Sequence, residues 1–185
     1  MAETKNAIPT ELGTEKIGRL LKQYALPAII AQTASSLYNM VDSIFIGQGV
    51  GPLAISGLAV TFPLMNLSTA FGTLVGAGAA TMLSVLLGQK NYKAANKVLG
   101  NVVTLNTIIG LVFMAVALIF IDPILYFFGA SENTLPYAIS YIRIYVLGTV
   151  FVQVTLGMNA YITAQGFTTV SMKTILIGAA LNMIL

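Results

Sequence analysis

Residues 24–46 read YALPAIIAQTASSLYNMVDSIFI, a segment that is apolar and long enough to cross a lipid bilayer. The segment nevertheless contains an aspartate, Asp42. At about 100° per residue of a helix, its polar side chains fall within about a third of the circumference. These are Gln32, Ser35, Ser36, Asn39, Asp42 and Ser43, hereafter the polar stripe. Because a charge buried in hydrocarbon costs about 2.5–3.5 kcal/mol, the stripe must face other helices or a hydrated cavity.

The composition of the whole chain is that of a membrane protein. Of the 185 residues, 57% are hydrophobic and 8% are charged, whereas soluble domains carry about 25% charged residues. The chain lacks cysteine, histidine and tryptophan, which excludes disulfides, thiol or imidazole catalysis and the usual zinc sites. The net charge of +3 does not indicate nucleic-acid binding, because the basic residues cluster beside apolar segments. We therefore expect a protein that is not an enzyme and needs no cofactor.

The apolar segments predict an all-α, polytopic membrane helix bundle. We expect spans at about residues 24–46, 53–87, 98–121, 135–164 and 171–185. Residues 1–23 are expected to be a cytoplasmic N-terminus with a short interfacial helix, a plain extension of the first span being the alternative. Because the last segment has no polar flank, we expect the chain to end inside its fifth span. It would then be the incomplete N-terminal lobe of a longer protein.

Residues 53–87 contain no charge and are far longer than one bilayer crossing. They form either one long helix or a tight hairpin. One helix puts the basic cluster at Lys90, Lys93 and Lys97 on the same side as Lys16–Lys22, whereas a hairpin puts the two clusters on opposite sides. The positive-inside rule favours one helix. It also predicts a cytoplasmic N-terminus, with Arg143 near the outer end of its span, where its side chain can reach the interface.

Isolated polar residues within the spans are the candidate functional groups. An aspartate within a membrane is a functional hypothesis by default, and Asp42 can exchange a proton or bind sodium. Asn182 can supply an amide oxygen to the same site, although asparagine often serves only to join helices, as Asn159 also can. Tyr38 and Met65 either line a cavity or simply pack.

Six motifs occur in an order and spacing that resembles the multidrug and toxic compound extrusion (MATE) family, in its bacterial branch with DinF-like and proton-coupled members. The likeness extends over almost the whole chain after about residue 14. The motifs are YALPAII, SSLYNMVDSIFIGQGVG, LVGAGAATMLSVLLGQKN, FGASENTLPYAISYIRI, NAYITAQG and GAALNMIL.

The resemblance implies a fold and a set of roles. Family members have twelve helices in two six-helix lobes, so this chain would be most of the N-terminal lobe. Asp42 and Asn182 would form the proton or sodium site, with a polar residue at position 186. Pro27 would be the point where the first helix bends. The cavity-lining positions would be Tyr38, Met65, Asn159 and Tyr141.

The implied function is an antiporter of the bacterial cytoplasmic membrane. It would export organic cations and amphipathic drugs by alternating access, driven by protons or sodium, and would need the missing second lobe and membrane lipid. A lipid-linked oligosaccharide flippase of the same superfamily is one alternative, disfavoured because the spans hold Asp42 and no buried lysine. A truncated, inactive membrane fragment is the other.

Overall fold

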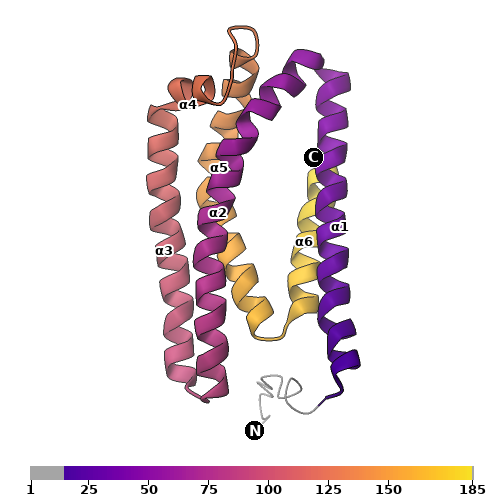
Figure 1. Cartoon of the computed structure of the whole chain (residues 1–185), viewed down its shortest axis with the longest axis vertical. Helices are drawn as coiled ribbons and strands as arrows, with labels where there is room; N and C mark the ends of the chain where they lie inside the picture. Colours follow the sequence, from indigo (N-terminus) through magenta and orange to yellow (C-terminus); the bar gives the residue numbers. More distant parts are fainter. Residues whose placement is uncertain (1–14, 185) are drawn as a thin grey trace.

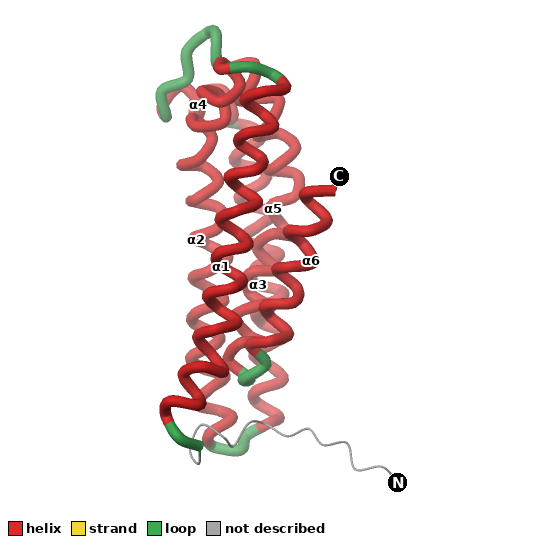
Figure 2. The backbone as a smooth tube through the Cα atoms, turned by 90° about the vertical axis from the view of Figure 1, so that its right-hand side faces the viewer, coloured by secondary structure: helices red, strands yellow, loops and turns green. Residues whose placement is uncertain are grey.

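A computed structural model describes residues 15–184, and within that range the chain is helical and contains no strand. The all-α fold is therefore confirmed, and the long helices run roughly along a common axis (Figures 1 and 2). The elements are α1 (Ile17–Gly49), α2 (Pro52–Gly88), α3 (Tyr92–Ile119), α4 (Ile121–Phe127), α5 (Leu135–Ala164) and α6 (Thr168–Ile184). The expectations for residues 1–14 lie outside the described residues.

The charge-free segment is one helix, α2, as the positive-inside rule predicted. The start of α1, the turn between α2 and α3 and the turn between α5 and α6 consequently lie at the same end of the bundle (Figure 1). This end carries the lysine clusters at residues 16–22 and 90–97. Asp122 and Glu132 lie at the opposite end, in α4 and the loop after it.

Helices α2, α3 and α5 pack closely against one another because glycines lie where their backbones meet. A Cβ atom added to Gly72 would lie 3.1 Å from Cα of Gln153 in α5, and one added to Gly110 would lie 3.0 Å from Cα of Val150. The spacing of Gly72 and Gly76, which indicates a face for close helix contact, thus has its partner in α5. We call this unit the three-helix core.

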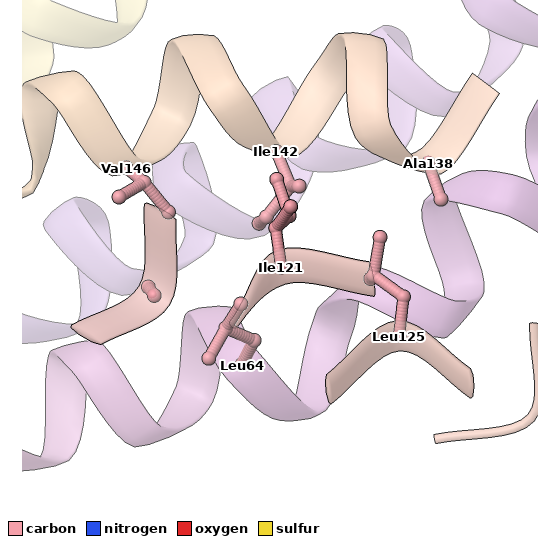
Figure 3. Close-up of a cluster of buried hydrophobic side chains, with 7 residues drawn as sticks. Leu64, Ile121, Leu125, Ala138, Ile142 and Val146 are labelled. Atoms are coloured by element: carbon pink, nitrogen blue, oxygen red, sulfur yellow. The ribbon is translucent and has the colours of Figure 1, made fainter. Parts of the chain in front are cut away.

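The outer end of the three-helix core is closed by an apolar cluster (Figure 3). Short helix α4 lies across the bundle axis (Figure 1). Its Ile121 and Leu125 pack among residues of α2 and α5 (Figure 3). These two meet Leu64 of α2 and Ile142 of α5, and all four are buried. Burial of these four apolar side chains away from water and lipid headgroups stabilises the packing of α4 against the bundle.

Helices α1 and α6 form a separate pair. They run parallel and pack mainly against each other, whereas α1 meets α2 and α6 meets α5 over much smaller areas (Figure 1). The molecule therefore consists of a tightly packed three-helix core and a loosely attached two-helix pair.

The helix boundaries differ from the expected spans in three places. The separate interfacial helix is absent, because residues from Ile17 continue unbroken into α1, as the alternative interpretation had it. Helix α3 begins at Tyr92 rather than near residue 98, since the Asn91 side chain accepts a hydrogen bond from the Ala94 N–H and caps it. Helix α4 lies in a segment that was expected to be a loop.

Three of the described helices, α2, α3 and α5, are long and apolar enough to cross a membrane. Two described helices do not meet this criterion of length and hydropathy. They are α1, which carries the polar stripe, and α6, whose described part has 17 residues. That these two also cross the bilayer stays a prediction.

Replacing Gly57 by alanine should destabilise the three-helix core. A Cβ there would lie 2.9 Å from Tyr137 Cβ and 3.1 Å from the Ala138 backbone nitrogen, atoms that cannot move without displacing α5. We expect Gly57→Ala to lower the free energy of unfolding in detergent by about 1–3 kcal/mol. Gly78→Ala in the same helix is the control, because a Cβ there meets nothing within 4 Å. An equal loss in both variants would contradict this explanation.

Candidate functional site

Asp42 lies in the upper half of α1 and is half-buried. No basic side chain neutralises it, since within residues 15–184 the single ion pair joins Arg19 to Glu15. An aspartate without a cationic partner in an apolar bundle is available to bind a proton, a metal cation or an organic cation.

Three side chains of the polar stripe are bonded to their own helix. The Ser36 hydroxyl donates to the Gln32 carbonyl at 3.0 Å, the Asn39 amide donates to the Ser35 carbonyl at 2.8 Å, and the Ser43 hydroxyl donates to the Asn39 carbonyl at 3.0 Å. Each hydroxyl has one proton to donate, so the oxygens of Ser36 and Ser43 keep their lone pairs as acceptors. These two acceptor oxygens lie on the same helix as Asp42.

One tyrosine of α5, Tyr141, lies near Asp42 of α1. Tyr141 lies within electrostatic reach of Asp42, Tyr38 and Tyr145, and Tyr145 lies within reach of Tyr38. The structure thus places Tyr141 near both Asp42 and Tyr38, and that these residues line a substrate cavity stays a prediction. It adds Tyr145, which sequence reasoning missed although its spacing of four residues from Tyr141 places both on one helix face.

Met65 of α2 lies at the edge of this group. It packs against the apolar cluster at the outer end of the three-helix core, as does Tyr145, and its sulfur lies 3.6 Å from the Thr61 hydroxyl. Met65 is half-buried, so it combines core packing with partial exposure.

Asn182 is exposed on α6, and no hydrogen bond joins it to Asp42 among the described residues. The base of α6 is fixed beside α1 by a hydrogen bond from the Thr168 hydroxyl to the Gln23 carbonyl. At a rise of 1.5 Å per helical residue, Asn182 lies about 21 Å along α6 from Thr168, and Asp42 lies about 28 Å along α1 from Gln23. Asn182 is thus about 7 Å lower, near the height of Tyr38, whereas the expected polar residue 186 would be level with Asp42.

Asn159 joins α5 to α6. Its side-chain carbonyl accepts hydrogen bonds from Ser171 at 2.6 Å and, more weakly, from Thr174 at 3.5 Å. The amide is half-buried near the turn between the two helices. A contact between helices is one of the roles that the sequence left open for Asn159. The turn between α5 and α6 lies at the end of the bundle where α1 begins, whereas Asp42 is in the other half of α1 (Figure 1).

A second polar group, missed from the sequence, lies inside the three-helix core. Asn106 of α3 and Gln153 of α5 are 0% exposed, and Gln153 donates to the Ser68 carbonyl at 3.4 Å. The Ser68 hydroxyl, to which Tyr145 comes close, has no hydrogen-bond partner among the described residues. The sequence offered no specific signal for this group, because the same spans hold other polar residues such as Asn66 and Thr107.

Residues 15–184 contain no group of three acidic side chains that could hold a metal ion. A cation at Asp42 would therefore be held by one carboxylate together with neutral oxygens. Such a set suits a monovalent ion or a proton rather than a tightly bound divalent metal.

A sequence model of the MatE family matches residues 27–185 of the chain. The chain belongs to this family. The match begins at Pro27 and includes the polar stripe, the tyrosine positions and α6.

Among relatives, the chain is similar to multidrug export protein MepA of Staphylococcus haemolyticus (strain JCSC1435). The two are 31% identical over 169 residues, which is 91% of this chain and 37% of that protein. The MepA of Staphylococcus aureus (strain MRSA252) is 30% identical over 167 residues, which is 90% of this chain and 37% of that protein. The chain thus spans less than two fifths of the length of these relatives.

The fold is similar to that of solved MATE structures. The MATE multidrug transporter DinF-BH, solved in complex with a ligand, superposes with a TM-score of 0.88 at 33% identity, covering 93% of this chain and 39% of that one. A MATE protein in the straight conformation superposes with a TM-score of 0.83 at 23% identity, covering 90% and 37%. The likeness confirms that the helices form a MATE-type N-terminal lobe.

Replacing Ser171 by alanine should loosen α6 from α5, because it removes the 2.6 Å hydrogen bond to Asn159. Hydrogen bonds between membrane helices contribute about 0.6 kcal/mol on average, and we expect a loss of that order in the free energy of unfolding. Ser140→Ala is the control, since that hydroxyl bonds only to its own helix, at the Pro136 carbonyl. Equal stability of both variants and the parent would show that Asn159 does not hold the two helices together.

Proposed function

We propose that the chain is the N-terminal lobe of a multidrug exporter that exchanges organic cations and amphipathic drugs for protons or sodium by alternating access. It would work in the bacterial cytoplasmic membrane with its N-terminus in the cytoplasm. The relatives named MepA are multidrug export proteins, and DinF-BH is a multidrug transporter that was solved with a bound ligand. The work would be shared with a second lobe that this chain does not contain.

One observation carries the proposal: Asp42 is half-buried, has no ion-pair partner among the described residues, and shares its helix with the acceptor oxygens of Ser36 and Ser43. Acceptor oxygens carry partial negative charge and make the electrostatic potential near Asp42 more negative. This potential repels anions, whereas a cation is attracted by each oxygen that it contacts. Drug cations and coupling ions therefore favour the same surface, and binding of one disfavours the other.

The tyrosines supply the second requirement, which is affinity for large apolar cations. Tyr141 lies within electrostatic reach of Asp42, and Tyr38 and Tyr145 lie within reach of Tyr141. A cation over the face of an aromatic ring gains about 0.5–2 kcal/mol. Together with half-buried Met65, whose flexible thioether adapts to differently shaped ligands, they would form a cavity that accepts many drugs. Asn159 would line its lower end.

Coupling would act through the charge of Asp42. Protonation would remove that charge. The carboxyl group would then attract a bound cation, and the polar groups of α6 near Asn182, less strongly. This loss of attraction would let α1 bend at Pro27. One charge that crosses 100 mV is worth about 2.3 kcal/mol. A single proton per cycle therefore supports a substantial but limited concentration gradient of drug.

The test is drug export by the longest form of the protein that its gene encodes. We expect Asp42→Asn to reduce the rate of export of a cationic dye at least about tenfold, because the amide keeps the size of the side chain and removes the charge on which exchange depends. The rate is measured in vesicles with an imposed proton or sodium gradient.

Glu132→Gln is the matched control, because it also neutralises an acidic side chain, but in the exposed loop at the outer end. It should export at the parental rate. Parental export by Asp42→Asn, with both variants inserted to the same level, would refute the proposal.

A further inference from the structure

Two carboxamide side chains lie wholly inside the three-helix core. Asn106 of α3 and Gln153 of α5 are 0% exposed, as is Ser68 of α2, whose carbonyl accepts a hydrogen bond from Gln153 at 3.4 Å. Among the described residues, four polar atoms here have no hydrogen-bond partner: Nδ2 and Oδ1 of Asn106, Oε1 of Gln153 and Oγ of Ser68. Buried polar groups in native proteins are nearly always hydrogen-bonded, either to protein or to ordered water. These atoms therefore indicate a bound partner.

Glycines hold the two amides against the opposite helix. Helices α3 and α5 run in opposite directions (Figure 1), and each has an amide and a glycine four residues apart. In α3 these are Asn106 and Gly110, and in α5 they are Gln153 and Gly157. A Cβ atom added to Gly157 would overlap the Asn106 amide nitrogen, and one added to Gly110 would lie 3.3 Å from Gln153 Oε1. The amide of each helix therefore meets the glycine of the other.

This arrangement separates the two amides along the bundle. Because four residues of a helix rise about 6 Å, the contact of Asn106 with Gly157 lies about 6 Å from the contact of Gln153 with Gly110. A direct N–H···O hydrogen bond needs about 2.9 Å between its heavy atoms, and none joins Asn106 to Gln153 among the described residues. A single water that bonds to both groups spans up to about 5–6 Å. The separation is thus of the size that one bridging molecule fills.

The chemistry of these groups fits water and not an ion. The Asn106 Nδ2 is a donor, whereas Asn106 Oδ1 and Gln153 Oε1 are acceptors. The amide N–H groups would repel a metal cation, and the carbonyl oxygens would repel an anion. A water molecule both donates and accepts, and buried waters typically make about three hydrogen bonds to groups that otherwise lack partners. Turning the Asn106 amide over exchanges its two atoms and leaves the set mixed.

Apolar side chains enclose the amides along the bundle axis. Val146 belongs to the apolar cluster at the outer end, and Val102 belongs to a second apolar cluster, toward the end where α1 begins. The polar neighbours lie on another side. The Ser68 hydroxyl comes close to Tyr145, which in turn lies within electrostatic reach of Tyr38 in α1. Polar contacts therefore lead from the amides toward the polar stripe.

We propose that Asn106, Gln153 and Ser68 form a binding site for an internal water molecule that bridges α3 to α5 inside the three-helix core. The Asn106 Nδ2 donates a hydrogen bond to the water, and the water donates one to Gln153 Oε1. The Ser68 hydroxyl forms the edge of the site on the side of Tyr145, where water enters. The site does not rest on the proposed function, because it needs only the packing of α2, α3 and α5.

The test is transfer of magnetisation from water to protein, measured by solid-state NMR on the longest form of the protein that its gene encodes, in lipid bilayers. The side-chain amide of Asn106, assigned through its own backbone signals, should receive water magnetisation several times faster than the backbone N–H of Leu83. Leu83 is equally 0% exposed but lies in an apolar cluster, so it is the dry reference. The exposed side chain of Asn91, in the turn before α3, is the wet reference.

The Asn106→Leu variant tests the bridge itself, because it keeps the size of the side chain and removes both hydrogen-bonding groups. The Gln153 side-chain amide should then lose its transfer from water. We expect the folding equilibrium constant in detergent to fall at least about threefold, the size of an average hydrogen bond between membrane helices. Thr107→Val is the matched control on α3, since that hydroxyl bonds to the Val103 carbonyl of its own helix, and it should match the parent.

A double-mutant cycle completes the test. Because removal of either amide leaves the other without its bridge, Asn106→Leu combined with Gln153→Met should lower the equilibrium constant by less than the product of the two single effects. Transfer to Asn106 in the parent as slow as to Leu83 would overturn the proposal, and so would unchanged transfer to Gln153 in Asn106→Leu. Export by Asp42→Asn bears on the proposed function only, so the two proposals can fail independently.

Discussion

A carboxylate within an apolar helix is the constraint on which the arrangement depends. Asp42 has no basic partner among the described residues, so its charge must be accommodated by polar groups or by a bound cation. The fold meets this requirement by keeping α1 away from the closely packed helices. Helices α1 and α5 are not a closely packed pair, yet Tyr141 of α5 lies within electrostatic reach of Asp42. A helix packed tightly on all sides would have no room for a hydrated carboxylate.

Two kinds of contact follow from this division. The three-helix core is joined by glycines that let backbones approach within van der Waals distance, as at Gly72 and Gly110. In the two-helix pair, single hydroxyl groups make the contacts: Thr168 bonds α6 to α1, and Ser171 bonds α6 to α5 of the core. Close backbone packing is rigid because no atom can be moved alone, whereas one hydrogen bond can exchange partners. The polar stripe lies on the part that is held by exchangeable bonds.

Much of the fold could be predicted from the sequence because the bilayer restricts the alternatives. The absence of charge in residues 53–87, together with the lysines on either side, was sufficient to predict one long helix. A family resemblance put Asp42 with Asn182 in a cation site and Tyr38 and Tyr141 in a cavity, whereas the closeness of Tyr141 to Asp42 and to Tyr145 needed the structure. The bond from Thr168 to the Gln23 carbonyl could not be predicted, since the sequence does not show which residues of α1 and α6 lie side by side. Asn106 and Gln153 were hidden for a similar reason: their burial depends on glycines of neighbouring helices.

The difference between glycine packing and hydroxyl contacts also ranks the ways in which this bundle can open. Parting α2 from α5 would open a void along closely packed backbones, and it would expose the 0% accessible amides of Asn106 and Gln153. Parting α1 and α6 together from the core would leave their mutual interface intact and break only a few side-chain contacts. The partly opened state of lowest free energy is therefore one in which the pair leaves as a unit. In such a state the backbone amides of α1 and α6 would stay in their helices, while the inner face of the pair, with Asp42, would become open to water.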